Sequence, residues 1–120
     1  MPYTIGEVAR MMNIAPSTLR YYEKEGLLSL GVRASNGQRT YTDDDIATLS
    51  IIEYLKFCGL PLKEIRSFLP LIRPGGETLE ARRAIMAKER DNVRAQIAAL
   101  QTKLERLEFG CWYYETAQQY

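Results

Sequence analysis

The chain has 120 residues, of which 46% are hydrophobic, enough for one packed domain with a short extension and too apolar for a disordered chain. Its formal net charge is +1, with nine basic and eight acidic residues in positions 1–73 and seven of each in positions 74–120, so no bulk basic excess indicates nucleic acid. The absence of histidine excludes histidine-based catalysis and histidine-ligated metal sites, and the two cysteines form neither a C-x-x-C pair nor a disulfide framework.

A helix-turn-helix is predicted at the start of the chain. Residues 4–12, TIGEVARMM, begin with Thr4 and Glu7 at the spacing of a capping box, and apolar residues then recur at helical spacing. After the turn NIA, Pro16 suits the first position of a second helix and Gly26 suits its end. Two short helices joined by a tight turn indicate a helix-turn-helix, although this pattern also arises by chance.

The second of these helices carries an unusual mixture of polar groups. Four of its residues share one face at helical spacing: Ser17, Arg20, Tyr21 and Lys24. Leu19 and Tyr22 point elsewhere, and we expect Tyr22 in the core. A hydroxyl, a guanidinium, a phenol and an ammonium on one face suit a polyanion with hydrogen-bonding base edges. We therefore expect Arg20 to read a base edge and Tyr21 to hold a phosphate.

A β-hairpin is predicted over residues 27–41, because Asn36-Gly37 is a strong type I′ turn signal between two strand-like runs. A hairpin directly after a helix-turn-helix is a wing. Its basic residues are Arg33 and Arg39, which are either DNA contacts or ordinary surface charges.

A second pair of helices is predicted after the wing. Thr42 caps a helix that runs to about Cys58 and stops at Gly59. Pro61 begins a short helix that Pro70 ends, and the Pro- and Gly-rich residues 71–76 read as a linker.

A single long helix is predicted from about residue 77 to residue 109. Its second half carries an apolar seam at a/d spacing: Val93, Ile97, Leu100, Leu104 and Leu107. Arg83 and Arg90 occupy seam positions in the first half. No other segment is long enough to cover the seam as an intramolecular hairpin, so we expect a partner helix. The tail, residues 110–120, is rich in aromatics and poor in charge.

These elements in this order predict a mainly α protein with a winged helix-turn-helix domain, and nothing in it resembles a catalytic site. Dimerisation through the long helix would place two recognition helices on a two-fold axis. Two other hypotheses stay open: a DNA-binding accessory module of a mobile element, and a coiled-coil interaction module whose basic face binds an acidic protein. Without a signal peptide or long apolar run, we expect a soluble, cytoplasmic chain that neither meets a membrane nor needs a cofactor.

The same residues resemble the MerR family of bacterial transcription regulators. The stretches YTIGEVARMMNIAPSTLRYYEKEGLL and GQRTYTDDDIATLSIIEYLKFCGLPLKEI are similar to the family's N-terminal signature and to its wing and second helix pair. The resemblance extends from residue 3 to about residue 109. It implies a DNA-binding domain over residues 1–70, a linker over 71–76, an antiparallel dimerisation coiled coil over 77–109 and a short tail over 110–120.

The resemblance also implies a mechanism. Dimers of this family bind palindromic promoters with an over-long spacer, and an effector makes them distort that DNA so that RNA polymerase can start. Residues facing the major groove would be Ser17, Thr18 and Arg20. Residues holding phosphates or reaching the groove from the wing would be Tyr21, Arg33, Arg39 and Tyr41, with Lys63 as a second phosphate contact.

The effector is a small molecule or an electrophile in this interpretation. The four clustered cysteines of iron–sulfur members and the cysteine set of metal-sensing members are absent, and the tail is most similar to the aldehyde- and electrophile-responsive branch. That branch typically has a cysteine near the position of Tyr54, and Cys58 lies one helical turn later. We expect Cys58 to be a small core residue. The candidate effector region comprises Cys58, Cys111, Trp112, Tyr113 and Tyr114, where Cys111 is an electrophile sensor, a weak metal ligand or a packing residue.

Overall fold

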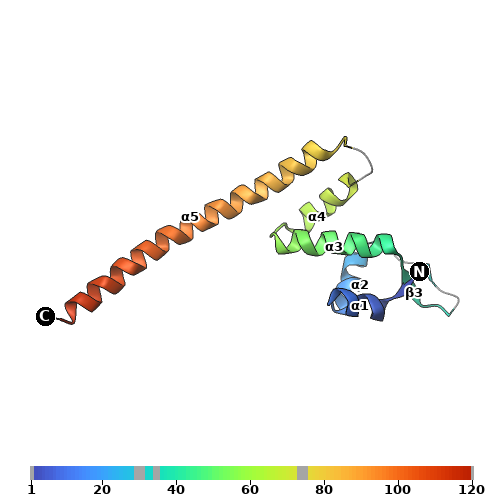
Figure 1. The fold of residues 1–120 in the computed structure, drawn as a ribbon. Helices are drawn as coiled ribbons and strands as arrows, with labels where there is room; N and C mark the ends of the chain where they lie inside the picture. The colour runs from blue at the N-terminus through green and yellow to red at the C-terminus, as the bar shows by residue number, and fades with distance from the viewer. Residues whose placement is uncertain (1, 29–31, 34–35, 73–75, 120) are drawn as a thin grey trace. The chain divides into compact units, whose positions relative to one another are not determined.

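The computed structural model describes residues 2–28, 32–33, 36–72 and 76–119, with the backbone alone at 32–33. The chain divides into two compact units, Met1–Arg82 and Arg83–Tyr120 (Figure 1). The first unit holds four α-helices and a small sheet among its described residues, and the second consists of most of one long helix.

The helix-turn-helix is present as predicted. Helices α1 (Ile5–Met12) and α2 (Pro16–Lys24) are joined by a three-residue turn. Both bonds of the capping box form, because the Glu7 amide donates to Thr4 Oγ1 over 3.1 Å and the Thr4 amide donates to Glu7 Oε1 over 2.9 Å. Helix α1 ends at Asn13, which adopts the left-handed conformation with φ 54°.

Helix α2 ends where glycine was expected to end it. Gly26 has φ +76°, its amide donates to the Glu23 carbonyl over 3.1 Å, and the Leu27 amide donates to the Tyr22 carbonyl over 2.9 Å. These are the two bonds of a Schellman motif, which satisfies the last helical carbonyls. The following residues, Leu27 and Leu28, are buried.

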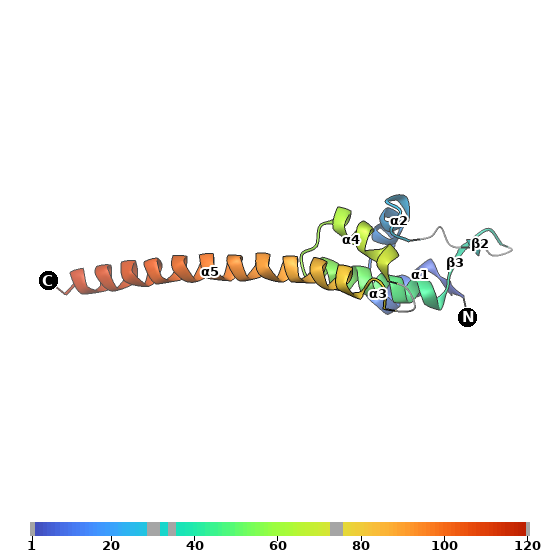
Figure 2. The same ribbon diagram turned by 90° about the horizontal axis from the view of Figure 1, so that it is seen from above.

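The wing is shorter than predicted and has a third strand. Strand β3 (Arg39–Tyr41) pairs antiparallel with β2 (Val32–Arg33) on one side and with β1 (Tyr3–Thr4) on the other. The prediction of a hairpin that begins at residue 27 is wrong, because the Leu27 and Leu28 amides bond to α2 instead of to a ladder. Viewed from above, β2 and β3 lie next to each other, beyond the end of α1 that follows β1 (Figure 2).

The second helix pair covers the helix-turn-helix. Helix α3 (Asp43–Phe57) begins with a capping box between Thr42 and Asp45, and Gly59 (φ +96°) follows its end. Helix α4 (Leu62–Phe68) leads directly into a 3-10 turn, η1 (Leu69–Leu71). The largest fully buried side chains come from α1, α2, β3, α3 and α4: Val8, Leu19, Tyr22, Tyr41, Leu49, Ile52, Leu55 and Ile65. A fully buried aliphatic side chain contributes about 1.5–3 kcal/mol, so this cluster holds the unit together.

The long helix, α5, spans Leu79–Ala117. The prediction that it ends near Phe109 is wrong, since it continues through Gly110 and takes in most of the expected tail. A single glycine inside a helix costs only about 1 kcal/mol relative to alanine, and no proline follows to stop the helix. Among the described helices, none is both long enough and apolar enough to span a bilayer.

Candidate nucleic-acid interface

Helix α2 has one buried side and one exposed side. Leu19, Tyr22 and Glu23 are buried, which confirms Tyr22 as a core residue. The side chains that the spacing placed on one face are all exposed: Ser17, Arg20, Tyr21 and Lys24. Tyr21 is 48% exposed, so a phenol stands on the surface beside the side chains of Arg20 and Lys24.

A basic cleft of about 670 Å³ lies between α2, the first turn of α1 and strand β3. Arg20 and Lys24 line it from α2, and Arg39 lines it from β3. Among the residues of its lining that the structure describes, Glu23 is the only acidic one. Charges distributed in this way suit an anion, although the net charge of the chain gave no such indication.

Glu23 is the charged residue that organises this cleft. Its side chain is 1% exposed, and its carboxylate accepts hydrogen bonds from the guanidinium of Arg39 and the hydroxyl of Tyr41. A buried carboxylate is tolerated only when it is paired and hydrogen-bonded, and both partners come from β3. The wing strand is therefore tied to the recognition helix through one buried group.

Sequence reasoning missed Glu23, although a signal was present. Glu23 follows Leu19 by four residues and Tyr22 by one, which places it on the buried side of α2. A carboxylate on an apolar face requires a cationic partner, and the wing arginines were the nearest candidates.

Tyr41 does not reach the surface. It was expected to contact DNA from the wing, but it is 0% exposed and its hydroxyl is bonded to Glu23. This prediction is wrong because the outward-facing positions of β3 are set by its pairing with β1, which places Tyr41 opposite Tyr3. Burial raises the pKa of Tyr41 above its ordinary value.

The structure describes the side chain of Arg39 and only the backbone of Arg33. The side chain of Arg39 is 35% exposed and lines the basic cleft while it pairs with Glu23. The side chain of Arg33 lies outside the described residues. Its backbone pairs with that of Arg39 in the β2–β3 ladder.

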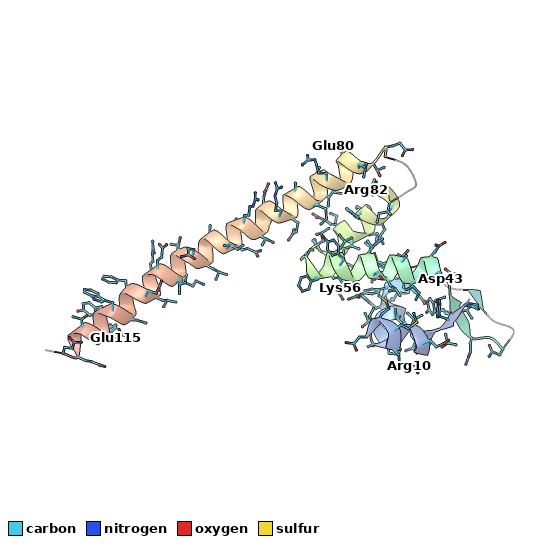
Figure 3. All side chains as sticks on the ribbon, in the orientation of Figure 1. Arg10, Asp43, Lys56, Glu80, Arg82 and Glu115 are labelled. Atoms are coloured by element: carbon cyan, nitrogen blue, oxygen red, sulfur yellow. The ribbon has the colours of Figure 1, made fainter. Side chains whose placement is uncertain are left out.

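A second, smaller cleft of about 390 Å³ lies where the start of α2 meets the end of α3. Its lining comprises Ser17, Thr18, Tyr21, Tyr22, Lys56 and Leu62. Lys56 Nζ donates to the Tyr22 hydroxyl oxygen over 2.7 Å, and that hydroxyl donates to Glu53 Oε1 over 2.8 Å. The bond to Tyr22 raises the pKa of Lys56, so its positive charge is secured beside the exposed face of α2. Figure 3 labels this lysine on α3.

Sequence reasoning also missed Lys56 and gave weight to Lys63 instead. Lys63 is exposed near the start of α4 but lines neither cleft. In the same helix, Arg66 pairs with the Glu25 carboxylate over 3.0 Å and so joins α4 to the end of α2.

The residues of the candidate effector region belong to different units. Cys58 is half-buried at the C-cap of α3, whereas Cys111 is exposed on α5. Trp112 lies 5.8 Å from Phe109 between ring centroids, and Tyr113 meets Tyr114 edge-on at 5.1 Å. Within the part of the chain that the structure describes, no group of three His, Cys, Asp or Glu side chains could hold a metal ion.

The apolar seam of α5 is exposed along its length. Its residues retain between 37% and 61% of their accessible surface: Val93, Ile97, Leu100, Leu104 and Leu107. An apolar row of this length on a soluble helix is normally covered by a partner helix.

Two family models match the chain. One, described as MerR HTH family regulatory protein, covers residues 3–71, and the other, described as MerR, DNA binding, covers residues 46–108. Together they take in the helix-turn-helix, the wing, the second helix pair and most of α5.

Individual relatives are similar over nearly the whole chain. An uncharacterized HTH-type transcriptional regulator of Haemophilus influenzae is 37% identical over 98% of this chain and 87% of its own length. The HTH-type transcriptional regulator ZntR of Escherichia coli is 36% identical over 91% of this chain and 80% of its own length. The crystal structure of HiNmlR, a regulator lacking the sensor domain and bound to promoter DNA, superposes with a TM-score of 0.67 at 37% identity, covering 98% of this chain and 94% of that one.

Proposed function

Because this chain belongs to the MerR family of helix-turn-helix transcriptional regulators, we propose that it binds a palindromic promoter as a homodimer and distorts an over-long spacer in response to an effector. It is a DNA-binding regulator and not an enzyme, as its relatives are.

The main observation in support of this proposal is the exposed face of α2. Ser17, Thr18 and Arg20 would meet base edges in the major groove, with Arg20 reading one base pair. Tyr21 would hold a phosphate beside them. The support is the division of α2 into a side locked in the core and a side of hydrogen-bonding groups turned outward.

Phosphate contacts would flank the recognition helix on both sides. Arg39 and Lys24 would neutralise the backbone at the basic cleft, with Arg33 joining them from the wing. Lys56 would serve the second cleft, and Lys63 would contact a phosphate further along α4. Contacts of this kind set the register of a protein on the duplex, while base contacts specify the sequence.

Dimerisation through α5 would supply the two-fold symmetry that a palindrome requires. The exposed seam supports this step, because a second copy offers the same surface in reverse and an isologous interface closes on itself. Two recognition helices would then meet two half-sites at a fixed separation.

The regulatory step would be a change of DNA shape. Bending a site of 20–30 base pairs costs about 1–6 kcal/mol, and phosphate contacts on both half-sites can offset that cost. An effector that favours the bent complex would realign the promoter elements for RNA polymerase. We propose Cys58, Cys111 and the aromatics of α5 as the region where such an effector acts.

The test of recognition is a single substitution with a charge-matched control. Arg20→Ala should weaken binding to the native promoter by about 1–3 kcal/mol and relax specificity at one base pair. Arg106→Ala removes the same charge from α5 and should leave both properties nearly unchanged. Fluorescence anisotropy with single-base promoter variants measures both, and an Arg20→Ala protein that keeps its affinity and specificity would refute the assignment.

The test of thiol sensing is made in cells. A variant with Cys58→Ser and Cys111→Ser should lose its response to aldehydes, quinones and soft metals at the target promoter if either thiol is the sensor. A full response to the native inducer would show that thiol sensing is wrong. The aromatic side chains of α5 would then be the better candidates for a non-covalent ligand site.

A further inference from the structure

We propose that Glu53 and Tyr22 hold the ammonium of Lys56 in place at the second cleft before DNA arrives, so that an acidic residue strengthens the binding of DNA. The inference rests on the DNA binding proposed above, and it adds two positioning residues to the phosphate contact at Lys56. Both act through the lysine, and neither needs to touch DNA.

The three side chains form a short network of hydrogen bonds between α2 and α3. The Tyr22 hydroxyl donates to Glu53 Oε1 over 2.8 Å and accepts a hydrogen bond from Lys56 Nζ over 2.7 Å. An ammonium can only donate, and an ionised carboxylate can only accept. The single proton of the hydroxyl therefore points to Glu53, and its lone pairs face Lys56.

Tyr22 is a firm support for the lysine head. It is 1% exposed in the core, and the ammonium of Lys56 lies 5.2 Å from the centroid of its ring. That distance is within the range of a cation–π contact. The hydrogen bond to Tyr22 also raises the pKa of Lys56, so the ammonium stays charged. The lysine head is thus attached at two points to a side chain that the core fixes.

The ammonium lies where a phosphate would approach the recognition helix. Besides Lys56, the lining of the second cleft includes three hydroxyl side chains of α2: Ser17, Thr18 and Tyr21. An ammonium has three N–H groups, so Lys56 can donate to a phosphate oxygen while it donates to Tyr22. Lys56 is exposed and Glu53 is half-buried, so the cation is the more accessible of the two charges.

Holding the lysine in advance lowers the cost of binding. Lysine has a flexible four-carbon stem, which loses much of its rotamer freedom when its head is fixed on a phosphate. Ordering one such side chain on binding is equivalent to about a two- to tenfold loss of affinity. The bonds to Tyr22 impose part of that order in the free protein, so less freedom is lost when DNA binds.

Simple charge repulsion predicts the opposite effect of Glu53. A carboxylate near a polyanion weakens binding, so removal of its charge should strengthen binding. If Glu53 instead orients the Tyr22 hydroxyl, its removal should weaken binding although the net charge becomes more favourable. The sign of the change therefore separates positioning from repulsion.

The first experiment compares two substitutions that remove the same charge. Glu53→Ala removes the acceptor of the Tyr22 hydroxyl and should weaken DNA binding by about two- to tenfold. Glu53→Gln keeps a carbonyl oxygen that can accept this bond and should bind at least as tightly as the native protein. Fluorescence anisotropy with a labelled duplex of mixed sequence at low salt measures both, because phosphate contacts need no particular sequence. A Glu53→Ala protein that binds as tightly as Glu53→Gln overturns the proposal.

The second experiment separates positioning from a purely structural role. Lys56→Met removes the ammonium and should reduce the slope of log affinity against log salt by about 1. Tyr22→Phe should weaken binding about as much as Glu53→Ala does. In the Lys56→Met background, neither substitution should affect binding any further, since no ammonium is left to position. A loss that persists without Lys56 means that these residues only support the fold, and it overturns the proposal.

Failure of this inference can be told apart from failure of the proposed function. If the native protein binds the duplex and Lys56→Met leaves its salt slope unchanged, Lys56 contacts no phosphate and the inference alone is overturned. A native protein that binds no DNA at low salt refutes the proposed function itself.

Discussion

At the scale of single residues, Glu23 does more for this protein than its position in a basic surface suggests. A carboxylate removed from water is costly, and here Arg39 and Tyr41 offset that cost from the neighbouring strand. The negative charge holds one wing cation at the edge of the recognition helix. The bond between the Tyr41 hydroxyl and Glu23 also explains why this buried tyrosine is not available to DNA.

The first prediction tests how much the Tyr41 hydroxyl contributes. Tyr41→Phe should lower the free energy of unfolding by about 1–3 kcal/mol, because the Glu23 carboxylate loses one of its two partners without access to water. The control is Tyr3→Phe on the paired strand, whose hydroxyl donates to Asp43 at the exposed surface over 2.8 Å. That variant should lie within about 0.5 kcal/mol of the native protein. Urea unfolding of both measures the difference, and equal losses would contradict the role given to Glu23.

The second prediction concerns alkaline pH. Burial raises the pKa of Tyr22 and of Tyr41 above the ordinary value of 10.0. A group whose pKa is raised on folding holds its proton more tightly in the folded state, so its contribution is complete below pH 10.0 and is lost as the pH rises further. The free energy of unfolding should therefore fall above that pH, and Tyr22→Phe should make the fall shallower. An unchanged slope in Tyr22→Phe, measured by urea unfolding across this range, would contradict the assignment to Tyr22.

Sequence reasoning placed Arg20 and Tyr22 of α2 on the correct faces and placed Tyr41 of β3 on the wrong one, for one physical reason. The helical period is fixed by local geometry, so Arg20 and Tyr22 could be placed on opposite faces without any partner. The face of a strand residue depends on its register with its neighbours, and for Tyr41 that neighbour is β1, a strand of two residues at the far end of the sequence. Such a strand leaves no periodic signal.

At the scale of elements, helix ends were predictable wherever a cap formed. Thr4, Thr42, Gly26 and Gly59 mark the ends that the structure shows, because each satisfies backbone groups that would otherwise lack partners. The predicted end of the long helix near residue 109 lacked such a cap. A glycine ends a helix only when the following chain can fold back, whereas the residues after Gly110 continue the helix to Ala117.

The third prediction tests the turn inside the helix-turn-helix. Asn13 has φ 54°, and its left-handed conformation lets the Ile14 amide donate to the Ala9 carbonyl over 3.0 Å. Asn13→Ala should lower the free energy of unfolding by about 1 kcal/mol, because a side chain with a bare Cβ strains this conformation. Asn13→Gly removes the strain and should remain within about 0.5 kcal/mol of the native protein. Chemical unfolding of the pair gives the comparison, and an Ala variant as stable as the Gly variant would contradict it.

At the scale of the whole molecule, the chain consists of a packed unit and a long helix whose apolar seam residues are exposed. The first unit buries its aliphatic residues among its own helices, while the seam residues of α5 remain exposed. The sequence could predict that seam from its spacing. It could not place the residues that would meet across it, because in the proposed homodimer those belong to another copy.

The fourth prediction is the loss of the dimer. Leu100→Glu places a charge in the middle of the proposed interface and should weaken association by several kcal/mol. Analytical ultracentrifugation should then show a monomer that no longer binds its promoter. Ala99→Glu adds the same charge to the neighbouring residue, outside the seam, and should remain dimeric. A Leu100→Glu protein that stays dimeric would mean that the interface lies elsewhere.

The arginines in the seam of α5 have a consequence for the choice of partner. A partner helix with an uninterrupted apolar seam would have to enclose the charged heads of Arg83 and Arg90, and removing charge from water costs free energy, so such a seam would be a poorer match. In the proposed homodimer, two residues that weaken the hydrophobic seam would therefore favour a partner that carries the same interruptions.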